Sequence, residues 1–181
     1  MIHAAAEAGE TVQRIRKFFQ EAAPEKARLR LNDIIEEIVP LAQSEALRKG
    51  VSLRTELSPE LPPVLGDRIQ VQQVLLNLIV NAMEAVGDVN DRPRQLLIRS
   101  EMEDPNRVLV AVVDSGAGMT PEAMKQLFEP FFTTKPQGVG MGLSISRSII
   151  EAHDGRLWAT PNASYGVTFQ FTLPADVANG P

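Results

Sequence analysis

The run RVLVAVVD at residues 107–114 constrains the fold most, because apolar side chains occupy consecutive positions. A strand that is apolar on both faces must be covered on both, so it lies inside a sheet and not at its edge. The run ends in Asp114, and Gly116 and Gly118 follow it. We therefore expect a central strand that leads into a tight turn carrying a carboxylate.

Helical and strand patterns are mixed along the rest of the chain. The predicted helices are 4–20, 31–49, 67–86, 120–128 and 143–155, and the predicted strands are 51–57, 95–102, 107–114, 156–160 and 165–173. Residues 24–30 read as a linker and residues 58–66 as a loop. This order predicts an α+β fold, a two-layer α/β sandwich in which helices cover one face of a mixed sheet, with a short N-terminal helix.

Composition narrows the class of protein. The net charge is −5, which gives no electrostatic footprint for nucleic acid, so we expect no nucleic-acid partner. The chain has no cysteine, which excludes disulfides and thiol chemistry. Its start, MIHAAAEAGE, has no signal-peptide pattern, and no apolar run approaches the roughly 20 residues of a membrane span. We expect a soluble piece in the cytoplasm.

Two asparagines stand four residues apart on the predicted helix 67–86. Asn77 and Asn81 therefore project from one face, and Glu84 lies on the same side. Amides in a helix interior are costly if unpaired, so the pair indicates a polar ligand such as Mg²⁺ together with phosphates. The alternative is a helix face that bonds to a neighbouring loop, and the asparagines alone do not decide between the two.

The turn after Asp114 suits a planar ligand. A carboxylate there can accept a hydrogen bond from an exocyclic amine, and Gly116 and Gly118 let a ring approach the backbone. The alternative is a simple strand-ending turn. Thr168, opposite Phe169 and Phe171 on the last strand, either bonds a ligand or faces water.

A glycine ladder, FFTTKPQGVGMGLSIS, fills residues 131–146. It lacks the lysine that a P-loop needs after its last glycine, and Leu143 stands where a dinucleotide fingerprint has its third glycine. Lys135 can meet a phosphate as a point charge. His3 and His153 are more consistent with structural or incidental roles than with catalysis.

Five segments in order carry a resemblance to a family. NLIVNAMEA, DSGAGM, FEPFFTTK, GVGMGLSIS and GVTFQFTLP resemble the asparagine box, first glycine box, phenylalanine box, second glycine box and closing strand of the ATP-binding domain of bacterial sensor histidine kinases. The resemblance covers roughly residues 31–174. It implies the Bergerat-type fold shared with gyrase B and MutL.

The resemblance also implies roles for individual residues. Asn81 is the expected principal Mg²⁺ ligand with Asn77 beside it, and Asp114, helped by Thr168, is the expected contact of the adenine amine. Residues 128–142 become a lid over the triphosphate, although Val139 departs from the glycine of many members. The remaining expected nucleotide contacts are Glu84, Gly116, Gly118, Met119, Phe128, Thr134, Lys135, Gly138, Val139, Gly140, Met141, Gly142 and Leu143.

The same resemblance favours a kinase over an ATP hydrolase. ATP-hydrolysing relatives carry a glutamate four residues before the metal-binding asparagine, and here Asn77 occupies that position. An amide cannot act as a general base for water. We therefore expect the γ-phosphoryl group of Mg-ATP to pass to a histidine on a dimerisation helix that has no match in this chain, for relay to a response regulator.

The expected organisation follows from that assignment. Residues 1–23 are the end of the dimerisation module, 24–30 a linker, 31–174 the ATP-binding domain and 175–181 a tail. The expected partners are ATP, the phosphoacceptor helices of a homodimeric parent kinase and a receiver domain, and the parent is soluble or membrane-anchored. Two alternatives stay open, an anti-sigma-type serine kinase and a non-enzymatic nucleotide-binding dimerisation module. The sequence does not identify the signal or the regulator.

Overall fold

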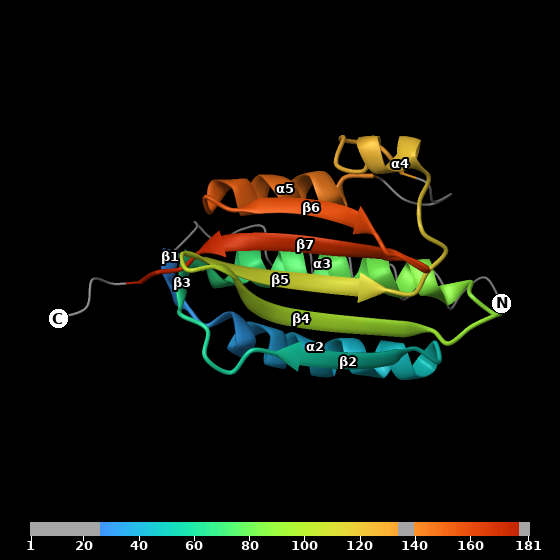
Figure 1. The fold of residues 1–181 in the computed structure, drawn as a ribbon, viewed down its shortest axis with the longest axis horizontal. Coiled ribbons are helices and arrows are strands. Elements are labelled where there is room, and N and C mark those ends of the chain that lie inside the picture. Colours follow the sequence, from blue (N-terminus) through green and yellow to red (C-terminus); the bar gives the residue numbers. More distant parts are fainter. Residues whose placement is uncertain (1–25, 134–139, 178–181) are drawn as a thin grey trace.

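The computed structural model describes residues 26–133 and 140–177, and its main feature is one mixed sheet (Figure 1). The five strands lie in the order β2-β4-β5-β7-β6, with β2 parallel to β4 and the other neighbours antiparallel. Their bounds are β2 Ser52–Leu57, β4 Gln95–Asp104, β5 Arg107–Asp114, β6 Arg156–Pro161 and β7 Val167–Pro174.

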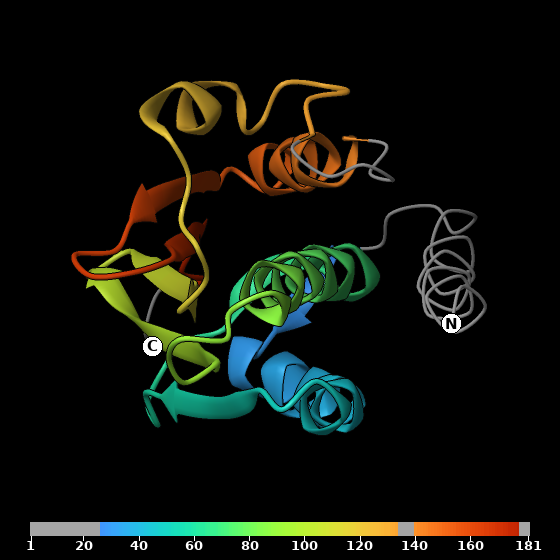
Figure 2. The ribbon, with the colours of Figure 1, turned by 90° about the vertical axis from the view of Figure 1, so that its right-hand side faces the viewer.

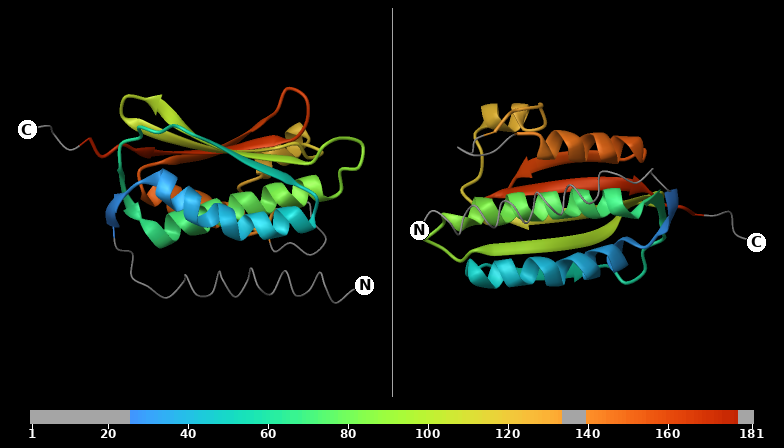
Figure 3. Two further views of the ribbon diagram at one scale, coloured as in Figure 1. Left: turned by 90° about the horizontal axis from the view of Figure 1, so that it is seen from below. Right: turned by 180° about the vertical axis from the view of Figure 1, so that it is seen from behind.

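Three helices form a layer on one face of this sheet (Figures 2 and 3). They are α2 (Leu31–Arg48), α3 (Arg68–Gly87) and α5 (Gly142–Ala152), and the short α4 (Pro121–Gln126) lies beside them. The prediction of an α+β sandwich with helices on one face of a mixed sheet is confirmed. The predicted N-terminal helix lies outside the described residues.

The strand β5 is central, as its apolar run predicts. Val108, Val110 and Val112 face the helices and are fully buried, and Leu109 and Ala111 on the opposite face are nearly so. Because β5 lies between β4 and β7, its backbone is hydrogen-bonded on both sides. Asp114 therefore stands at the end of a strand that is held by a neighbour on each side.

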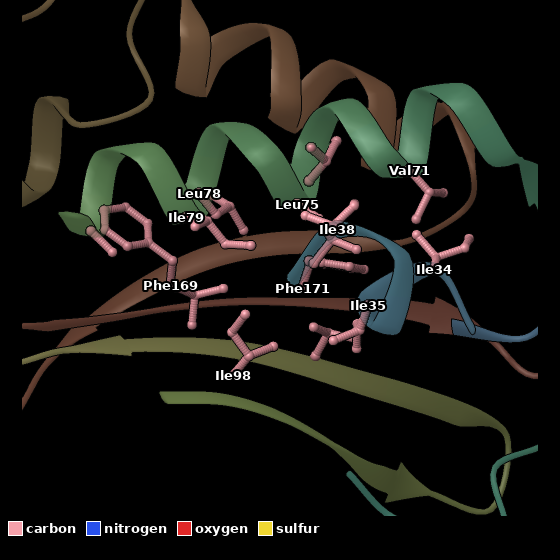
Figure 4. Close-up of a cluster of buried hydrophobic side chains, with 14 of the residues drawn as sticks. Ile34, Ile35, Ile38, Val71, Leu75, Leu78, Ile79, Ile98, Phe169 and Phe171 are labelled. Atoms are coloured by element: carbon pink, nitrogen blue, oxygen red, sulfur yellow. The ribbon is translucent and has the colours of Figure 1, made fainter. Parts of the chain in front are cut away.

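The core lies between the sheet and the helix layer (Figure 4). Ile34, Ile35 and Ile38 of α2 and Leu75 of α3 pack over Phe171 of β7 there. The helix α3 is long and apolar enough to cross a membrane by length and composition alone, but half of that stretch is buried inside the fold. Burial in this core is the simpler explanation of its apolar character.

The start of α3 lies at the beginning of the predicted helix 67–86, where Asp67 and Gln70 form a D-x-x-Q capping pattern in the sequence. Asp67 precedes the helix in an extended conformation, and its Oδ1 accepts a hydrogen bond from the Gln70 N–H at 2.9 Å. This N-cap satisfies one of the backbone donors that a helix start leaves without a partner. The cap fixes where α3 begins, and hence the direction in which Asn77 and Asn81 project from it.

Two short strands were not predicted. β1 (Lys26–Leu29) and β3 (Val64–Asp67) pair antiparallel in a separate two-stranded sheet, where the sequence indicated a linker and a loop. Strands of four residues are too short to show alternation, and their reason for pairing is the burial of Leu29 and Val64 beneath the helices. The expected linker 24–30 is thus partly a strand of the domain.

The beginning of the expected tail is also part of the fold. Ala175 N–H donates to the carbonyl of Asn106, and Asp176 N–H donates to that of Pro63. Asp176 in addition forms an ion pair with Arg28 of β1 at 2.7 Å. Residues 175 and 176 therefore tie the small sheet to the end of β7.

Candidate functional site

The carboxylate of Asp114 is the most unusual polar group in the described structure. Its side chain is buried, and Oδ1 accepts hydrogen bonds from the N–H groups of Gly116 at 2.8 Å and Val167 at 3.2 Å. In the part of the chain that the structure describes, Oδ2 has no hydrogen-bond partner. Buried polar atoms in folded proteins are almost always paired, so Oδ2 indicates a missing donor.

Burial also sets the acid strength of this group. Removal from water raises the pKa of the Asp114 carboxyl above its usual value, because the charged form loses hydration. The bonds from Gly116 and Val167 stabilise the carboxylate and lower the pKa, which offsets part of the effect. A ligand N–H at Oδ2 would stabilise the charged form further.

Glycines let the backbone close around this carboxylate. A Cβ at Gly116 would lie 2.7 Å from the carbonyl oxygen of Ala85, and one at Gly166 would lie 2.5 Å from Oδ1 of Asp114. Gly166 also has a φ of 82°. Gly116 was predicted, whereas Gly166 was missed, although its place directly before the last strand was a signal for it. Gly118 has a φ of 80° in more open space, so its backbone conformation is what requires glycine.

Thr168 lies on the face of β7 opposite Phe169 and Phe171, as the sequence analysis places it. Its hydroxyl donates to Oδ1 of Asn162 at 2.5 Å, and Asn162 Nδ2 donates to the backbone carbonyl of Asp114 at 2.8 Å. The alternation of β7 puts Val167 on the helix side and Thr168 on the other face. The structure therefore does not bring the Thr168 hydroxyl to the Asp114 carboxylate, and it adds Asn162 to the site.

The expected metal ligands lie on α3. Asn77 is buried, Asn81 is half-buried and Glu84 is exposed. The Asn77 amide nitrogen donates to Oγ of Ser146, a buried residue of α5, at 3.0 Å. Asn77 thus bonds to a neighbouring helix, and this bond fixes the orientation of its amide.

The donor set on α3 can be tested against Mg²⁺. Among residues 26–133 and 140–177, no group of three or more His, Cys, Asp or Glu side chains is placed to hold a metal ion. Mg²⁺ in nucleotide sites is bound through a few protein oxygens, water and the phosphates themselves. The amides of Asn77 and Asn81, with the carboxylate of Glu84 on the same helix, fit that kind of site and no all-protein cage.

Two residues of the glycine ladder, Phe131 and Gly140, contact each other. Phe131 N–H donates to the carbonyl of Gly140 at 2.9 Å, and both residues have positive φ, 67° and 70°. A Cβ at Gly140 would lie 2.5 Å from the Phe131 carbonyl carbon, so glycine is needed there. The ladder then continues directly into α5, which begins at Gly142 after Met141. Thr134, Lys135, Gly138 and Val139, which the sequence analysis places in the lid, lie outside the described residues.

Three other predicted nucleotide contacts lie against the core. Met119, Phe128 and Leu143 are partly buried and pack against the core. Phe128 lies beneath the Arg147 guanidinium, 5.6 Å from it to the ring centroid.

A hollow of about 400 Å³ opens beside Phe131, and neither Asp114 nor Asn81 lines it. Its lining is Gln70, Pro130, Phe131, Met141, Ser144, Ile145, Ser148, Ile149 and Ala152. This lining is mainly apolar and carries no charged side chain. The unpaired carboxylate oxygen is the better guide to a ligand.

His153 has a structural role. It is buried, its Nε2 accepts from the Asp67 N–H at 2.9 Å, and its Nδ1 lies 2.7 Å from the Ile149 carbonyl. Nδ1 therefore carries the proton, and the ring ties the end of α5 to the start of α3. A Cβ at Gly66 would lie 2.9 Å from this ring.

Comparison with known proteins agrees with these features. Residues 66–177 match the model of the family described as histidine kinase-, DNA gyrase B- and HSP90-like ATPase. The sensor protein FixL of Bradyrhizobium diazoefficiens is 45% identical over 168 residues, which cover 93% of this chain and 33% of FixL. The chain thus spans about a third of the length of this relative.

Solved structures show the same likeness. The nucleotide-free catalytic domain of the histidine kinase ThkA superposes with a TM-score of 0.74 at 38% identity, covering 83% of this chain and 96% of that one. ThkA in complex with the response regulator protein TrrA gives a TM-score of 0.74 at 33% identity, covering 95% of this chain and 48% of that one.

A matched pair of glycine substitutions tests the packing at Asp114. Gly166→Ala and Gly50→Ala both place alanine at a positive φ, but a Cβ at Gly50 would meet no described atom within 4 Å. We expect Gly50→Ala to lower the free energy of unfolding by about 1 kcal/mol and Gly166→Ala by at least about 2 kcal/mol more. Urea denaturation measures both, and equal losses would contradict the tight packing.

A second prediction concerns the charge of Asp114. Since the folded-state pKa is raised, the folded state binds the proton more tightly, and the ionised carboxylate costs stability above that pKa. Asp114→Asn keeps the acceptor at Oδ1 and removes the charge, so at pH 7 it should raise the free energy of unfolding by about 1 kcal/mol.

The gain from Asp114→Asn should shrink as the pH falls through the raised pKa towards 3.8, because the wild-type carboxyl is then neutral too. Urea denaturation of both proteins at several pH values measures this. Glu101→Gln, on the exposed end of β4, is the control and should show no such gain. A loss of stability for Asp114→Asn at pH 7 would refute the assignment.

Proposed function

The chain belongs to the histidine kinase-, DNA gyrase B- and HSP90-like ATPase family, and we propose that it is the Mg-ATP-binding domain of a longer sensor histidine kinase. In this proposal the domain donates the γ-phosphoryl group of ATP to a histidine on a dimerisation helix. The observation that carries it is the buried Asp114 carboxylate with one oxygen unpaired among the described residues.

An adenine ring satisfies that oxygen. Its exocyclic amine is a donor that can meet Oδ2, while Oδ1 stays bonded to Gly116 and Val167. A base with a carbonyl at the same position would face the carboxylate with an acceptor, which costs affinity because both groups are desolvated. The family assignment supports ATP as the nucleotide.

The proposal also includes a Mg²⁺ ion bound with the ATP. Asn81 and Asn77 are the proposed ligands, and Mg²⁺ supplies neutralisation of charge on the phosphates. The bond from Asn77 to Ser146 supports this, because it sets the amide in one orientation on α3. The positive end of α5, which begins at Gly142, supports phosphate binding beside it. The proposed lid spans residues 128–142.

Phosphoryl transfer to protein is favoured over hydrolysis. The hydrolysing members of the family that the sequence resembles have a glutamate where this chain has Asn77. The Asn77 nitrogen donates to Ser146, and an amide has no basic site with which to take a proton from water. Water is therefore a poor nucleophile here.

The acceptor is proposed to lie on the dimerisation helices. His153 cannot serve, because it is buried and both ring nitrogens are engaged. His3 lies outside the described residues and lacks the family's surrounding pattern. The proposed organisation keeps residues 1–23 as the end of the dimerisation module. The catalytic domain extends beyond the expected 31–174, because β1 and residues 175 and 176 belong to its fold.

The partners follow by analogy. The solved complex of ThkA with the response regulator protein TrrA supports a receiver domain as the next acceptor. We propose a homodimeric parent, soluble or membrane-anchored, with this domain in the cytoplasm. An anti-sigma-type serine kinase and a non-enzymatic nucleotide-binding module remain as alternatives that experiment separates.

Nucleotide preference tests the proposed site. Titration calorimetry with Mg²⁺ should show that the chain binds ATP and prefers it over inosine triphosphate, which has a carbonyl in place of the amine. Asp114→Asn should weaken ATP binding at least about tenfold, roughly 1.4 kcal/mol, and should shrink the preference, because its amide can donate to that carbonyl. Equal ATP affinities for wild type and Asp114→Asn would show that Asp114 does not belong to the site. Glu101→Gln is the control and should bind ATP as the wild type does.

Labelling tests the reaction. With radiolabelled Mg-ATP, this chain alone should neither label itself appreciably nor hydrolyse ATP quickly, since positioning of the nucleophile supplies most of the catalysis. Joined to the dimerisation helices of a parent kinase, it should acquire acid-labile label on histidine. Acid-stable label would favour the serine kinases, and acid-labile label on the chain alone that is lost in His3→Gln would make His3 the acceptor.

A further inference from the structure

Three consecutive backbone carbonyls at the end of β5 are each held by a side chain from another loop. Asn162 Nδ2 donates to the carbonyl of Asp114 at 2.8 Å. Arg92 donates from Nε to the carbonyl of Ser115 at 3.3 Å and from Nη2 to that of Gly116 at 3.0 Å. Arg92 comes from the connection between α3 and β4, and Asn162 from the turn between β6 and β7.

Tyr165 joins these two side chains. The Arg92 guanidinium lies over its ring, 3.9 Å from the centroid, and Asn162 Nδ2 also donates to its backbone carbonyl at 2.9 Å. Both connections lie at the end of the sheet where β5 ends (Figure 1). Arg92, Tyr165 and Asn162 therefore form a closed ring of contacts around residues 114–116, and we call these three residues the clamp.

The clamp acts on the atoms that hold Asp114. Gly116 N–H and Val167 N–H fix Oδ1. Both belong to segments that the clamp joins, because Gly116 follows the end of β5 and Val167 follows Gly166 at the start of β7. A shift of Gly116 relative to Val167 would rotate the carboxylate and move Oδ2. Displacements of about 1 Å are enough to lose a well-aligned polar contact.

We propose that the clamp positions the Asp114 carboxylate for the adenine amine, so that Arg92 and Tyr165 determine the preference for adenine without touching the base. This inference rests on the proposed ATP site. A guanidinium is planar and can bond two carbonyls from its edge while its face lies on an aromatic ring. An ammonium group is a point charge and cannot hold both carbonyls and the ring in that arrangement.

The side chains of the clamp differ in exposure in a way that helps a test. Tyr165 is 56% exposed, so its replacement opens no cavity in the core. The Arg92 side chain is 18% exposed, and its Nη1 donates to the exposed carboxylate of Asp91 at 2.9 Å. Substitutions at both positions should leave the fold intact.

The experiment compares ATP with inosine triphosphate, both with Mg²⁺, by titration calorimetry. The variants are Tyr165→Leu, which removes the aromatic face, and Arg92→Lys, which removes the two-carbonyl fork. The matched controls are Tyr165→Phe, which keeps the face, and Arg99→Lys, which alters an exposed ion pair of β4 with Glu56. The quantity compared is the ratio of the two dissociation constants.

We expect Tyr165→Leu and Arg92→Lys to reduce the preference for ATP about fivefold, the size of a moderate cation–π or hydrogen-bond contribution. Tyr165→Phe and Arg99→Lys should keep the wild-type ratio. A role in stability alone would lower both affinities equally and leave the ratio unchanged, and that result would overturn the inference while the proposed function stands. A wild-type chain that does not bind ATP, or does not prefer it, would overturn both.

Discussion

The burial of one carboxylate at the end of the central strand is the constraint on which the site depends. Asp114 cannot move with a flexible loop, since β5 is hydrogen-bonded on both sides. Half of its hydrogen-bonding capacity is used by backbone donors, and the other half is unpaired among the described residues. The folded protein bears this cost in stability, which is typical of groups kept for binding.

The helix layer brings the second half of the site to the same region. The cap at Asp67 sets the start of α3, and the bond from Asn77 to Ser146 joins α3 to α5. The glycine ladder runs directly into α5, which begins at Gly142. A change of conformation at the ladder therefore acts on α5, whose Ser146 accepts the hydrogen bond from Asn77. The carboxylate proposed to contact the base and the helices proposed to bind the phosphates therefore stand on separate supports, the central strand of the sheet and the pair α3 and α5.

The sequence revealed the parts of the fold whose signals are local. The apolar run of β5, the cap of α3 and the turn at Gly116 were readable, because each depends on neighbours in the chain. The strands β1 and β3 were not, because pairing between distant short segments leaves no periodicity. The face of Thr168 was readable from the alternation of the last strand, but its hydrogen bond to Asn162 was not, because it joins two segments across a turn. Arg92 and Asn162 act across loops, so only the folded chain shows them.

The most direct test of the account is a crystal structure of the chain with Mg²⁺ and a non-hydrolysable ATP analogue. The account predicts that the exocyclic nitrogen of adenine lies about 3 Å from Oδ2 of Asp114, with Oδ1 still bonded to Gly116 and Val167. A base bound elsewhere, such as in the hollow beside Phe131, with Oδ2 still unpaired, would contradict it.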